Sequence, residues 1–548
     1  MMHVLIAPVF EKALISIHAH NIVPLVFEIP KTIEHGHLST NIAMTLARHL
    51  KRKPADIAQD IINALVFEDD IVESVQIAGA GFINIYAKPA LFHHVIESIR
   101  LKGNDYGKTE YGKGKSANVE YVSANPTGKL HLGHGRNAAI GDTIANLLEW
   151  AGYKVTREYY FNNAGNQMNM LAKSIFARYR QLCGTPEYPF PEDGYHGDYI
   201  KDIAQKAIDL YGSEYTDPSD EILSSFRKIG EEWCFSSILN TLKNMKIHQD
   251  TYFNEDSLYH DGTIDNLLNE LKTKGLSYQK DGATWFNFSR IDESLTDRVI
   301  VKQTGEPTYR LPDIAYHRNK FERNYDIIVD IFGADHIATI PDVTAALKAL
   351  DYDIKKLKVL IYQFVTLWEN GEQVKMSKRS GKSYTLDELI DEVGPDIVRF
   401  FFIMRGAQTQ LEFDLNIARE QNDKNPVYYL QYVHARICSM ISNAADKELI
   451  PNLDAPLRFL TAPAELTLIT ALSRFEESTL KAAHAMEPQI IAEYLRETAS
   501  AFHSFYHDCR IIGEEHNISQ ARINLALITK TVIHNGLAIL GISSPEKM

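Results

Sequence analysis

The chain has 548 residues, of which 45% are hydrophobic and 23% are charged, and its formal net charge at pH 7 is −14. This length is enough for about three or four domains. The acidic balance excludes a surface that is basic overall, so any contact with a polyanion has to come from local basic patches.

The sequence lacks the patterns of a secreted or membrane protein. Its 4 cysteines are scattered without a C-x-x-C pair, which argues against a disulfide framework and against a zinc ribbon. Glu11 and Lys12 interrupt the apolar residues near the start, and no apolar run approaches the ~20 residues of a membrane span. We therefore expect a cytoplasmic protein in a reducing compartment, without a membrane partner.

The first predicted domain, residues 1–105, mixes helices and strands. Apolar residues have helical spacing at 10–20 and at 40–52, whereas 81–87 alternates like a strand after a Gly-Ala-Gly turn. The stretch 101–116 is rich in glycine and lysine, which is typical of a linker. We place the first domain boundary there.

The second predicted domain, residues 115–410, has an α/β pattern. Apolar strands are expected at 118–122, 154–161, 325–333 and 358–365. Their alternation with helices predicts a Rossmann-like, doubly wound parallel sheet. Residues at about 170–280 read as a mostly helical insertion, and parts of 283–310, including PTYR, as a small antiparallel patch.

The third predicted domain, residues 415–548, has only helical patterns. The expected helices are 426–445, 464–486, 488–509 and 518–540. Pro426 suits the first position of a helix, where its missing N–H costs nothing. Four amphipathic helices with short connections predict an antiparallel all-α bundle.

Two histidines stand among glycines after the first strand of the second domain, in the segment GKLHLGHGR. Ligands of open α/β sheets bind outside the carboxyl ends of the strands, and a helix N-terminus there offers N–H groups to a phosphate. Gly133 and Gly135 would let a ligand lie against the backbone, and His131 and His134 would donate hydrogen bonds to phosphate oxygens. The alternatives are structural histidines and a metal site, for which no third ligand stands at a recognisable spacing.

A second candidate phosphate site lies far downstream, in the segment VKMSKRSGKS. Lys375 and Lys378 stand there among serine and glycine residues, which suits a triphosphate or its leaving pyrophosphate. The alternative is an ordinary solvated basic turn. Thr385, with Glu388 three residues later, predicts that a helix begins directly after this segment.

The segments HLGH and KMSKR resemble the two signature sequences of class I aminoacyl-tRNA synthetases. VEYVSANPTGKLHLGHGRNAAIGD, QYVHAR and GLAILGISSPEKM resemble arginyl-tRNA synthetases, and with HGHLSTNIAMTLAR and GAGFINI the resemblance extends over essentially the whole chain. It implies an enzyme that activates L-arginine with ATP and Mg²⁺, releases pyrophosphate and transfers arginine to the 3′-terminal adenosine of tRNA(Arg). The alternatives are another class I synthetase, such as the cysteinyl type, and a non-catalytic tRNA-binding paralogue.

The resemblance implies catalysis by positioning and charge stabilisation, without a nucleophile from the protein. His131 and His134 would stabilise the transition state, and Lys375 and Lys378 would hold the leaving phosphates. Further ATP contacts are implied at Lys129, Gly133, Gly135, His336, Met376 and Ser377. For Lys129, where many related sequences have proline, a phosphate contact and a merely exposed side chain both stay open. We expect no metal ion tightly bound by the protein itself.

A guanidinium group is planar and permanently charged, and a carboxylate recognises it best. The resemblance places the amino-acid site on Glu120, Ser123, Asn125, Glu255, Tyr309 and Asp313. We expect Asp313, Glu255 and Tyr309 on the guanidinium side, and Asn125 with Ser123 at the α-amino end. Geometry then distinguishes arginine from lysine without an editing domain. Gly333 stands where many family members carry a glutamine, which leaves that contact open.

The resemblance also implies tRNA contacts in both outer domains. The first domain is similar to the family's N-terminal addition, which touches the outer corner of tRNA, and the bundle is similar to its anticodon-binding module. Arg436, Lys530 and Tyr432 would bind RNA by phosphate contacts and stacking. Alternatively, the tyrosines pack inside the bundle. The family is mostly monomeric, and we expect no DNA partner.

Overall fold

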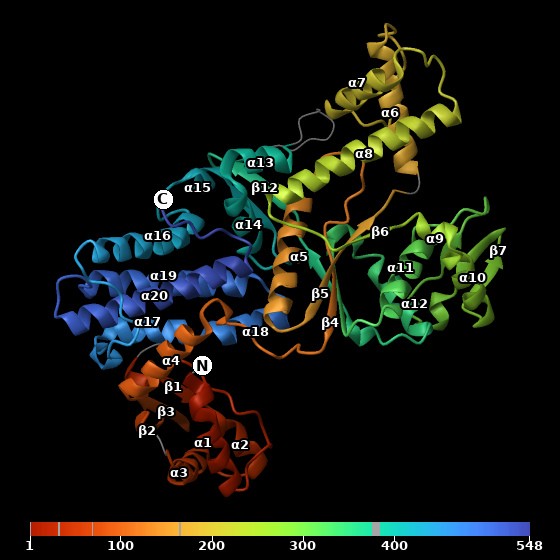
Figure 1. Cartoon of the computed structure of the whole chain (residues 1–548). Helices are drawn as coiled ribbons and strands as arrows, with labels where there is room; N and C mark the ends of the chain where they lie inside the picture. The colour runs from red at the N-terminus through yellow and green to blue at the C-terminus, as the bar shows by residue number, and fades with distance from the viewer. Residues whose placement is uncertain (1, 31–32, 68–69, 164–165, 375–383) are drawn as a thin grey trace.

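The computed structural model describes residues 2–30, 33–67, 70–163, 166–374 and 384–548. A small α/β domain at the N-terminus, a central domain built on a parallel sheet and a helical C-terminal bundle follow one another along the chain (Figure 1). This architecture confirms the predicted fold class.

The N-terminal domain has an antiparallel sheet in the order β1-β3-β2. Its strands are β1 (Leu38–Thr40), β2 (Val72–Ala78) and β3 (Phe82–Ala87), and its helices are α1 (Met2–Ser16), α2 (Ile42–Leu50), α3 (Pro54–Ala64) and α4 (Pro89–Lys102). Ile83 and Ile85 of β3 are fully buried, as the predicted alternation requires. Helix α1 ends earlier than predicted, and His18 beyond it has a left-handed φ of 58°.

The central sheet has five parallel strands within the described ranges, in the order β11-β10-β4-β5-β6. They are β4 (Ser116–Glu120), β5 (Lys154–Phe161), β6 (Thr251–Asn254), β10 (Ile327–Gly333) and β11 (Leu357–Tyr362). The chain runs outward from β4 through β5 to β6 and then returns to the other side of β4. The sheet is therefore doubly wound, with its switch point between β4 and β10.

Helices cover both faces of this sheet (Figure 1). Helix α5 (Leu132–Trp150) follows β4 on one face, and α11 (Arg310–Glu322) and α12 (Ile340–Ala349) lie on the other. Successive side chains at the end of β4 point to opposite faces of the sheet. Tyr121 packs against Gly141 of α5, whereas Glu120 contacts Lys320 of α11.

The predicted helical insertion differs from the structure near its end. Helices α6 (Asn166–Leu182), α7 (Tyr199–Tyr211) and α8 (Asp220–Asn244) have their own apolar core and project from the body (Figure 1). However, β6 lies inside the predicted insertion and pairs with β5 as an edge strand of the central sheet. Its four residues are only partly buried or exposed, so the sequence carries no apolar run to reveal it.

After β6 come α9 (Ser257–His260), α10 (Thr263–Thr273) and an antiparallel sheet of β7 (Ser277–Lys280), β8 (Ala283–Phe286) and β9 (Arg298–Val301). The predicted strand PTYR is wrong beyond a single bridge between Pro307 and Val301. Beside this bridge the Thr308 N–H donates to the Ile300 carbonyl of β9 (2.8 Å), and the chain then enters α11 with Tyr309 at the N-cap position.

The predicted strand 358–365 is divided between two sheets. Strand β11 ends at Tyr362, and β12 (Val365–Glu369) pairs with β13 (Glu372–Gln373) and β14 (Leu411–Asp414). The buried Arg136 of α5 causes the break, because its guanidinium donates to the carbonyls of Gln363 (2.7 Å) and Gly406 (3.0 Å). These bonds hold the backbone at Gln363 away from the hydrogen-bonded pairing of β11 with β10.

Beyond residue 384, where every residue is described, the remaining elements are helical apart from β14. They are α13 (Leu386–Val393), α14 (Pro395–Ile403), α15 (Leu415–Arg419), α16 (Pro426–Ala445), α17 (Pro463–Ser473), α18 (Phe475–Ala485), α19 (Gln489–Asp508) and α20 (His516–Ile539). Pro426 begins α16, as predicted, but the predicted helix 464–486 is divided at Arg474. No helix in the described part of the chain is long and apolar enough to cross a membrane.

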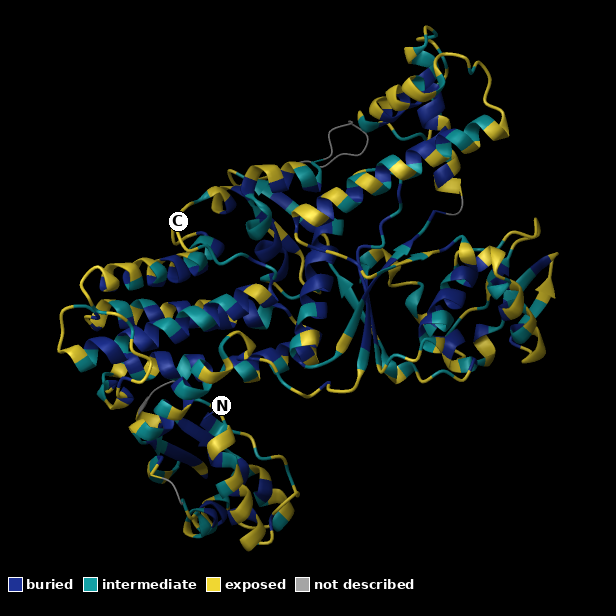
Figure 2. Ribbon diagram, viewed as in Figure 1, coloured by how far each residue is buried: buried dark blue, intermediate teal, exposed yellow. Residues whose placement is uncertain are grey.

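Buried side chains continue from the bundle through α5 into the sheet (Figure 2). Arg399 of α14 is fully buried at this junction. Its guanidinium donates to the carbonyls of Leu540 and Met245 and to Asp142 of α5 (2.6 Å). The bundle and the central domain therefore share one hydrogen-bonded core, which fixes the helix that carries the two histidines.

Substitution of Gly141 tests the contact between α5 and β4. A Cβ atom there would lie 2.3 Å from both Cβ and Cγ of Tyr121, atoms tied to the strand backbone. We expect Gly141→Ala to lower the melting temperature, because the clash, typically ~1–3 kcal/mol, outweighs the ~1 kcal/mol that alanine contributes in a helix.

Gly230→Ala is the matched control, because its Cβ would meet only side-chain ends of Ile175 and Leu171, which can rotate away. Differential scanning calorimetry compares the two. A Gly141→Ala protein as stable as the Gly230→Ala protein would contradict the packing described here.

Candidate active site

A cleft of about 730 Å³ opens at the carboxyl ends of β4 and β10, the switch point of the sheet. Predicted site residues from five separate segments line it: Glu120, Ser123, Asn125, His131, Gly133, His134, Glu255, Tyr309, Asp313 and His336. Open parallel sheets bind ligands at this position. The structure thus brings the predicted amino-acid residues and the histidine loop into one cavity.

His131 is the N-cap of α5, and both histidines complete the cap. The His131 Nδ1 accepts hydrogen bonds from the backbone N–H groups of Gly133 (3.1 Å) and His134 (3.3 Å), and the His134 Nδ1 accepts one from the His131 N–H (3.4 Å). The two rings stack with centroids 3.6 Å apart. Because each Nδ1 is an acceptor, the proton of each neutral ring lies on Nε2, which makes that atom the hydrogen-bond donor.

The glycines of this loop have different surroundings. Gly133 lines the cleft. Gly135 is buried, and a Cβ there would lie 2.6 Å from Leu386 Cδ1 and 2.8 Å from Phe402 Cε2. Gly135 therefore packs between α5, α13 and α14 and is not among the residues that line the cleft. Its contact with ATP stays a prediction. Lys129 is exposed and is not part of the cleft lining.

Lys375, Met376, Ser377 and Lys378 lie outside the described residues. Shortly after this segment, Thr385 approaches the histidine loop and forms a β-bridge with His131. Next to it, the Leu386 N–H donates to the Leu130 carbonyl (2.9 Å). Thr385 also caps α13 with Glu388, which confirms the predicted helix start. Residues 384–386 are thereby attached to the first turn of α5.

A buried lysine forms the floor of the cleft. The Lys320 ammonium group is fully buried and donates to Glu120 Oε2 and to Asp330 Oδ1 (2.5 Å). The other Glu120 oxygen accepts from the Ser123 hydroxyl (2.8 Å). Burial raises the pKa of the Glu120 carboxyl, and the Lys320 charge acts against this. Since both oxygens of Glu120 accept hydrogen bonds, it is present as a carboxylate.

The backbone after β4 is strained where it enters the cleft. Val122 and Ser123 have φ values of 69° and 41°, in the left-handed region that a β-branched residue rarely adopts. Asn137 of α5 holds this turn, because its side chain accepts from the Val122 N–H (2.6 Å) and donates to the Ile331 carbonyl (2.8 Å). Asn137 therefore links β4, α5 and β10, and no sequence pattern singles it out.

Two further carboxylates, Asp313 and Glu255, face the cleft, and His317 Nδ1 lies 3.9 Å from Asp313 Oδ1. In the described part of the chain, no lysine or arginine pairs with Asp313 or Glu255. Glu255 accepts from the Tyr259 hydroxyl (3.3 Å). Burial raises the pKa values of both carboxyl groups, and the charge of Asp313 raises that of Glu255 further. A cationic ligand would relieve this repulsion.

The remaining predicted residues lie around the mouth of the cleft. Tyr309 is 60% exposed. Asn125 donates to Gln167 (2.7 Å) at the start of α6, and His336 stacks on Phe332 with ring centroids 5.3 Å apart. Gly333 lines the cleft, and a Cβ there would meet the Asp335 carboxylate at 2.4 Å. Phe364, which the sequence did not single out, is 65% exposed at the same mouth.

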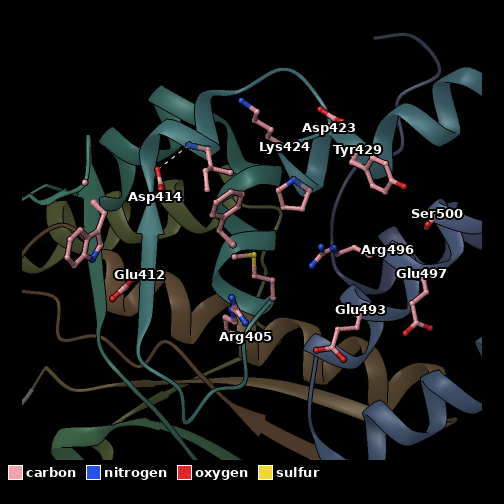
Figure 3. Close-up of a pocket in the computed structure, with 16 residues that line it drawn as sticks. Arg405, Glu412, Asp414, Asp423, Lys424, Tyr429, Glu493, Arg496, Glu497 and Ser500 are labelled. Atoms are coloured by element: carbon pink, nitrogen blue, oxygen red, sulfur yellow. Dashed lines mark hydrogen bonds between the residues drawn. The ribbon is translucent and has the colours of Figure 1, made fainter. Parts of the chain in front are cut away.

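The predicted tRNA-contact residues lie on two helices of the bundle, α16 and α20. Tyr432, 37% exposed, and Arg436 lie on α16, with the Arg436 guanidinium 4.9 Å from the Tyr506 ring centroid. Lys530 of α20 lines a different cavity of about 520 Å³ near the end of α4. A further cavity of about 950 Å³ lies between β14 and helices α16 and α19 and holds none of the predicted residues (Figure 3).

No group of three or more His, Cys, Asp or Glu side chains suited to a metal ion occurs among the described residues.

One cluster next to the cleft was not predicted from the sequence: His317, Lys320 and Asp330. Asp313, His317 and Lys320 are four and three residues apart in the segment DIAYHRNK, a spacing that places them on one helix face. This spacing is a signal for the three residues of α11, whereas Asp330 joins them only through the pairing of β10 with β4.

Three family models match the chain: "Arginyl tRNA synthetase N terminal domain" at residues 5–87, "tRNA synthetases class I (R), catalytic domain" at 95–397, and "DALR anticodon binding domain" at 430–548. The arginine–tRNA ligase of Desulfotalea psychrophila is 47% identical over 523 residues, 95% of this chain and 94% of that protein. That of Salinibacter ruber is 48% identical over 539 residues, 95% of each.

Solved structures agree with this assignment. The structure of a putative arginyl-tRNA synthetase from Campylobacter jejuni superposes with a TM-score of 0.77 at 31% identity, covering 84% of this chain and 100% of that chain. The arginyl-tRNA synthetase of Thermus thermophilus covers 100% of both chains with a TM-score of 0.78 at 21% identity, which supports the fold. From its sequence, its fold and these relatives, the chain belongs to the arginyl-tRNA synthetase family of class I aminoacyl-tRNA synthetases.

Proposed function

We propose that the chain is an arginine–tRNA ligase whose cleft activates L-arginine with ATP and then transfers it to tRNA(Arg). One observation carries this proposal: two carboxylates that pair with no lysine or arginine among the described residues face the same cavity as a histidine-capped helix N-terminus. The carboxylates suit the guanidinium of arginine, and the helix N-terminus suits a phosphate. The cysteinyl-type and non-catalytic alternatives lose their support, because the relatives described above are arginine–tRNA ligases.

In the first step, a carboxylate oxygen of arginine attacks the α-phosphorus of ATP. A new oxygen–phosphorus bond forms, the bond to the β-phosphate oxygen breaks, and pyrophosphate leaves with its electron pair. We assign the stabilisation of this transition state to Nε2–H of His131 and His134 and to the N-terminus of α5. A donor of this kind typically contributes about 3–4 kcal/mol. Lys375 and Lys378, outside the described residues, are proposed to hold the pyrophosphate, whose Mg²⁺ arrives with ATP.

For arginine itself, we assign the guanidinium to Asp313 and Glu255, with Tyr309 at the cleft mouth. A planar fork of N–H groups can bind both carboxylates, whereas the ammonium of lysine cannot match this geometry. The α-amino group is assigned to Asn125 and Ser123. Glu120 acts indirectly, because it accepts a hydrogen bond from the Ser123 hydroxyl (2.8 Å) and so sets the position of that hydroxyl.

For tRNA, we assign Tyr432 and Arg436 on α16 to stacking and phosphate contact, and Lys530 to a separate contact beside α4. All three residues belong to the helical bundle, and Lys530 lies on the side of the bundle that faces α4. We further propose that the protein works as a monomer in the cytoplasm. Its four cysteines are unpaired, which fits a reducing compartment.

Aminoacylation of total tRNA with each of the twenty amino acids tests the proposed function. We expect charging with arginine alone, and arginine-dependent exchange of pyrophosphate into ATP that appears when tRNA is added. Charging with cysteine, or tight tRNA binding without any charging, would overturn the assignment.

Replacing Asp313 by asparagine tests the assignment of the guanidinium. Removal of one charged partner of a buried pair costs about 2–5 kcal/mol, so KM for arginine should rise by about 100-fold, with KM for ATP little changed. Asp209→Asn, on the exposed face of α7, removes the same charge elsewhere and should leave KM unchanged. Equal KM values for the two variants would contradict the assignment.

Replacing Arg436 by glutamine tests the tRNA assignment. Loss of one phosphate contact should weaken tRNA binding and reduce the slope of log Kd against log salt by about one. Lys206→Gln, an exposed lysine on α7, is the control that changes net charge equally. Identical salt slopes for the two variants would show that Arg436 does not contact phosphate.

A further inference from the structure

His317 of α11 is buried between two hydrogen-bond acceptors. It is 3% exposed. Its Nδ1 lies 2.8 Å from the main-chain oxygen of Asp313, one helical turn earlier, and its Nε2 lies 3.0 Å from Asp330 Oδ2 on β10. A carbonyl oxygen accepts hydrogen bonds and never donates them. Nδ1 therefore carries a proton, and the charge of the ring depends on Nε2.

The proton between Nε2 and Asp330 belongs to the imidazole if Asp330 is ionised. The other oxygen of Asp330 accepts from the buried Lys320 ammonium at 2.5 Å, which stabilises the carboxylate. Although burial acts against ionisation, Lys320 and His317 lower the pKa of Asp330 to about 2. Burial likewise opposes the charge of His317, but its hydrogen bond to Asp330 raises the pKa of the ring above its usual value.

We propose that His317 is an imidazolium at neutral pH that acts as a positioning residue for Asp313 and so sets the affinity of the cleft for arginine. This inference rests on the proposed function only for its consequence on arginine binding. His317 ties the first turns of α11 to β10, and with them the backbone that carries Asp313. The bond at Nδ1 fixes the Asp313 carbonyl, and the same nitrogen lies 3.9 Å from Asp313 Oδ1, so the imidazolium also holds the carboxylate that lines the cavity.

The charges of the cluster balance only if His317 is charged. The ring faces Asp313 and Lys320 on its own helix and Asp330 on β10, while Glu120 of β4 and His336 lie one step further away. Lys320 and an imidazolium together offset Glu120 and Asp330. Asp313 and Glu255 then keep the negative charge that a guanidinium requires. A neutral His317 would leave an additional negative charge buried beneath the site.

The sign of the pH dependence follows from these contacts. The pKa of His317 in the folded protein lies above the ~6.5 of an unfolded histidine. Its contribution to stability is therefore complete below about pH 6.5 and is lost only as the pH rises through the higher pKa of the folded state. Below that value, KM for arginine should not show the titration of a free histidine near pH 6.5.

NMR of the full-length protein labelled with ¹⁵N-histidine measures the charge directly. The His317 resonances are identified as those absent from His317→Gln or, if that protein does not fold, from His317→Phe. We expect both ring nitrogens to carry protons at pH 7.5. A neutral ring, with one unprotonated nitrogen at this pH, would overturn the proposal whatever the activity of the enzyme.

Kinetics test the positioning role. His317→Phe keeps a planar ring but donates no hydrogen bond, and we expect KM for arginine to rise at least tenfold while KM for ATP changes less than twofold. His317→Gln, which retains an N–H donor, should recover part of this loss. His507→Gln, at the exposed end of α19, is the matched control and should behave as wild type.

Different results would refute the proposed function and the proposed role of His317. If the wild-type protein does not activate arginine, the proposed function falls, while the NMR result still decides the charge of His317. If the wild-type protein is active and His317→Phe keeps its KM for arginine within twofold, the positioning role is refuted. Equal increases of KM for arginine and for ATP would also refute it, because they would indicate general disorder of the cleft.

Discussion

The shared hydrogen bonds of one buried ammonium group hold the two strands at the switch point of the sheet. The ends of β4 and β10 place Glu120 and Asp330 side by side in the interior, where two carboxylates alone would repel each other. Lys320, from α11 on the same face, donates to both. This contact joins β4, β10 and α11 into one rigid floor. Ser123 is bound to Glu120 above it, and Asp313 lies on the same helix as Lys320, so the geometry of the cleft depends on this ion triad.

Local sequence patterns were enough for the elements that build the site, but not for its floor. The strand 154–161 and the helix 426–445 have the predicted bounds, because apolar periodicity and Pro426 specify them within the segment itself. The histidine loop was predicted at a helix start after a strand, where it is found. His317 and Lys320 were missed because their partners come from β4 and β10, and only pairing across the sheet gives them a role. Gly135 has a packing role that the motif did not reveal, since Leu386 and Phe402 from distant segments lie against it.

Strain and buried cations concentrate around the same cleft. The left-handed turn at Val122 and Ser123 persists because Asn137 satisfies its backbone and ties it to β10. One residue earlier in α5, Arg136 is buried with backbone carbonyls as its acceptors and bends the chain away from β11 toward β12. Sequence periodicity cannot show either effect, because both depend on side chains of α5 that reach segments far along the chain. Together they hold the first turn of α5, the end of β4 and the start of β12 in fixed relation.

A crystal structure with a non-hydrolysable arginyl-adenylate analogue tests the central claim most directly. The account predicts the guanidinium between Asp313 and Glu255, with the adenylate linkage beside His131 and His134 at the N-terminus of α5. It also predicts that the bonds of Lys320 to Glu120 and Asp330 are unchanged by the ligand. A guanidinium bound away from both carboxylates, for example in the cavity between β14 and α19, would contradict the account.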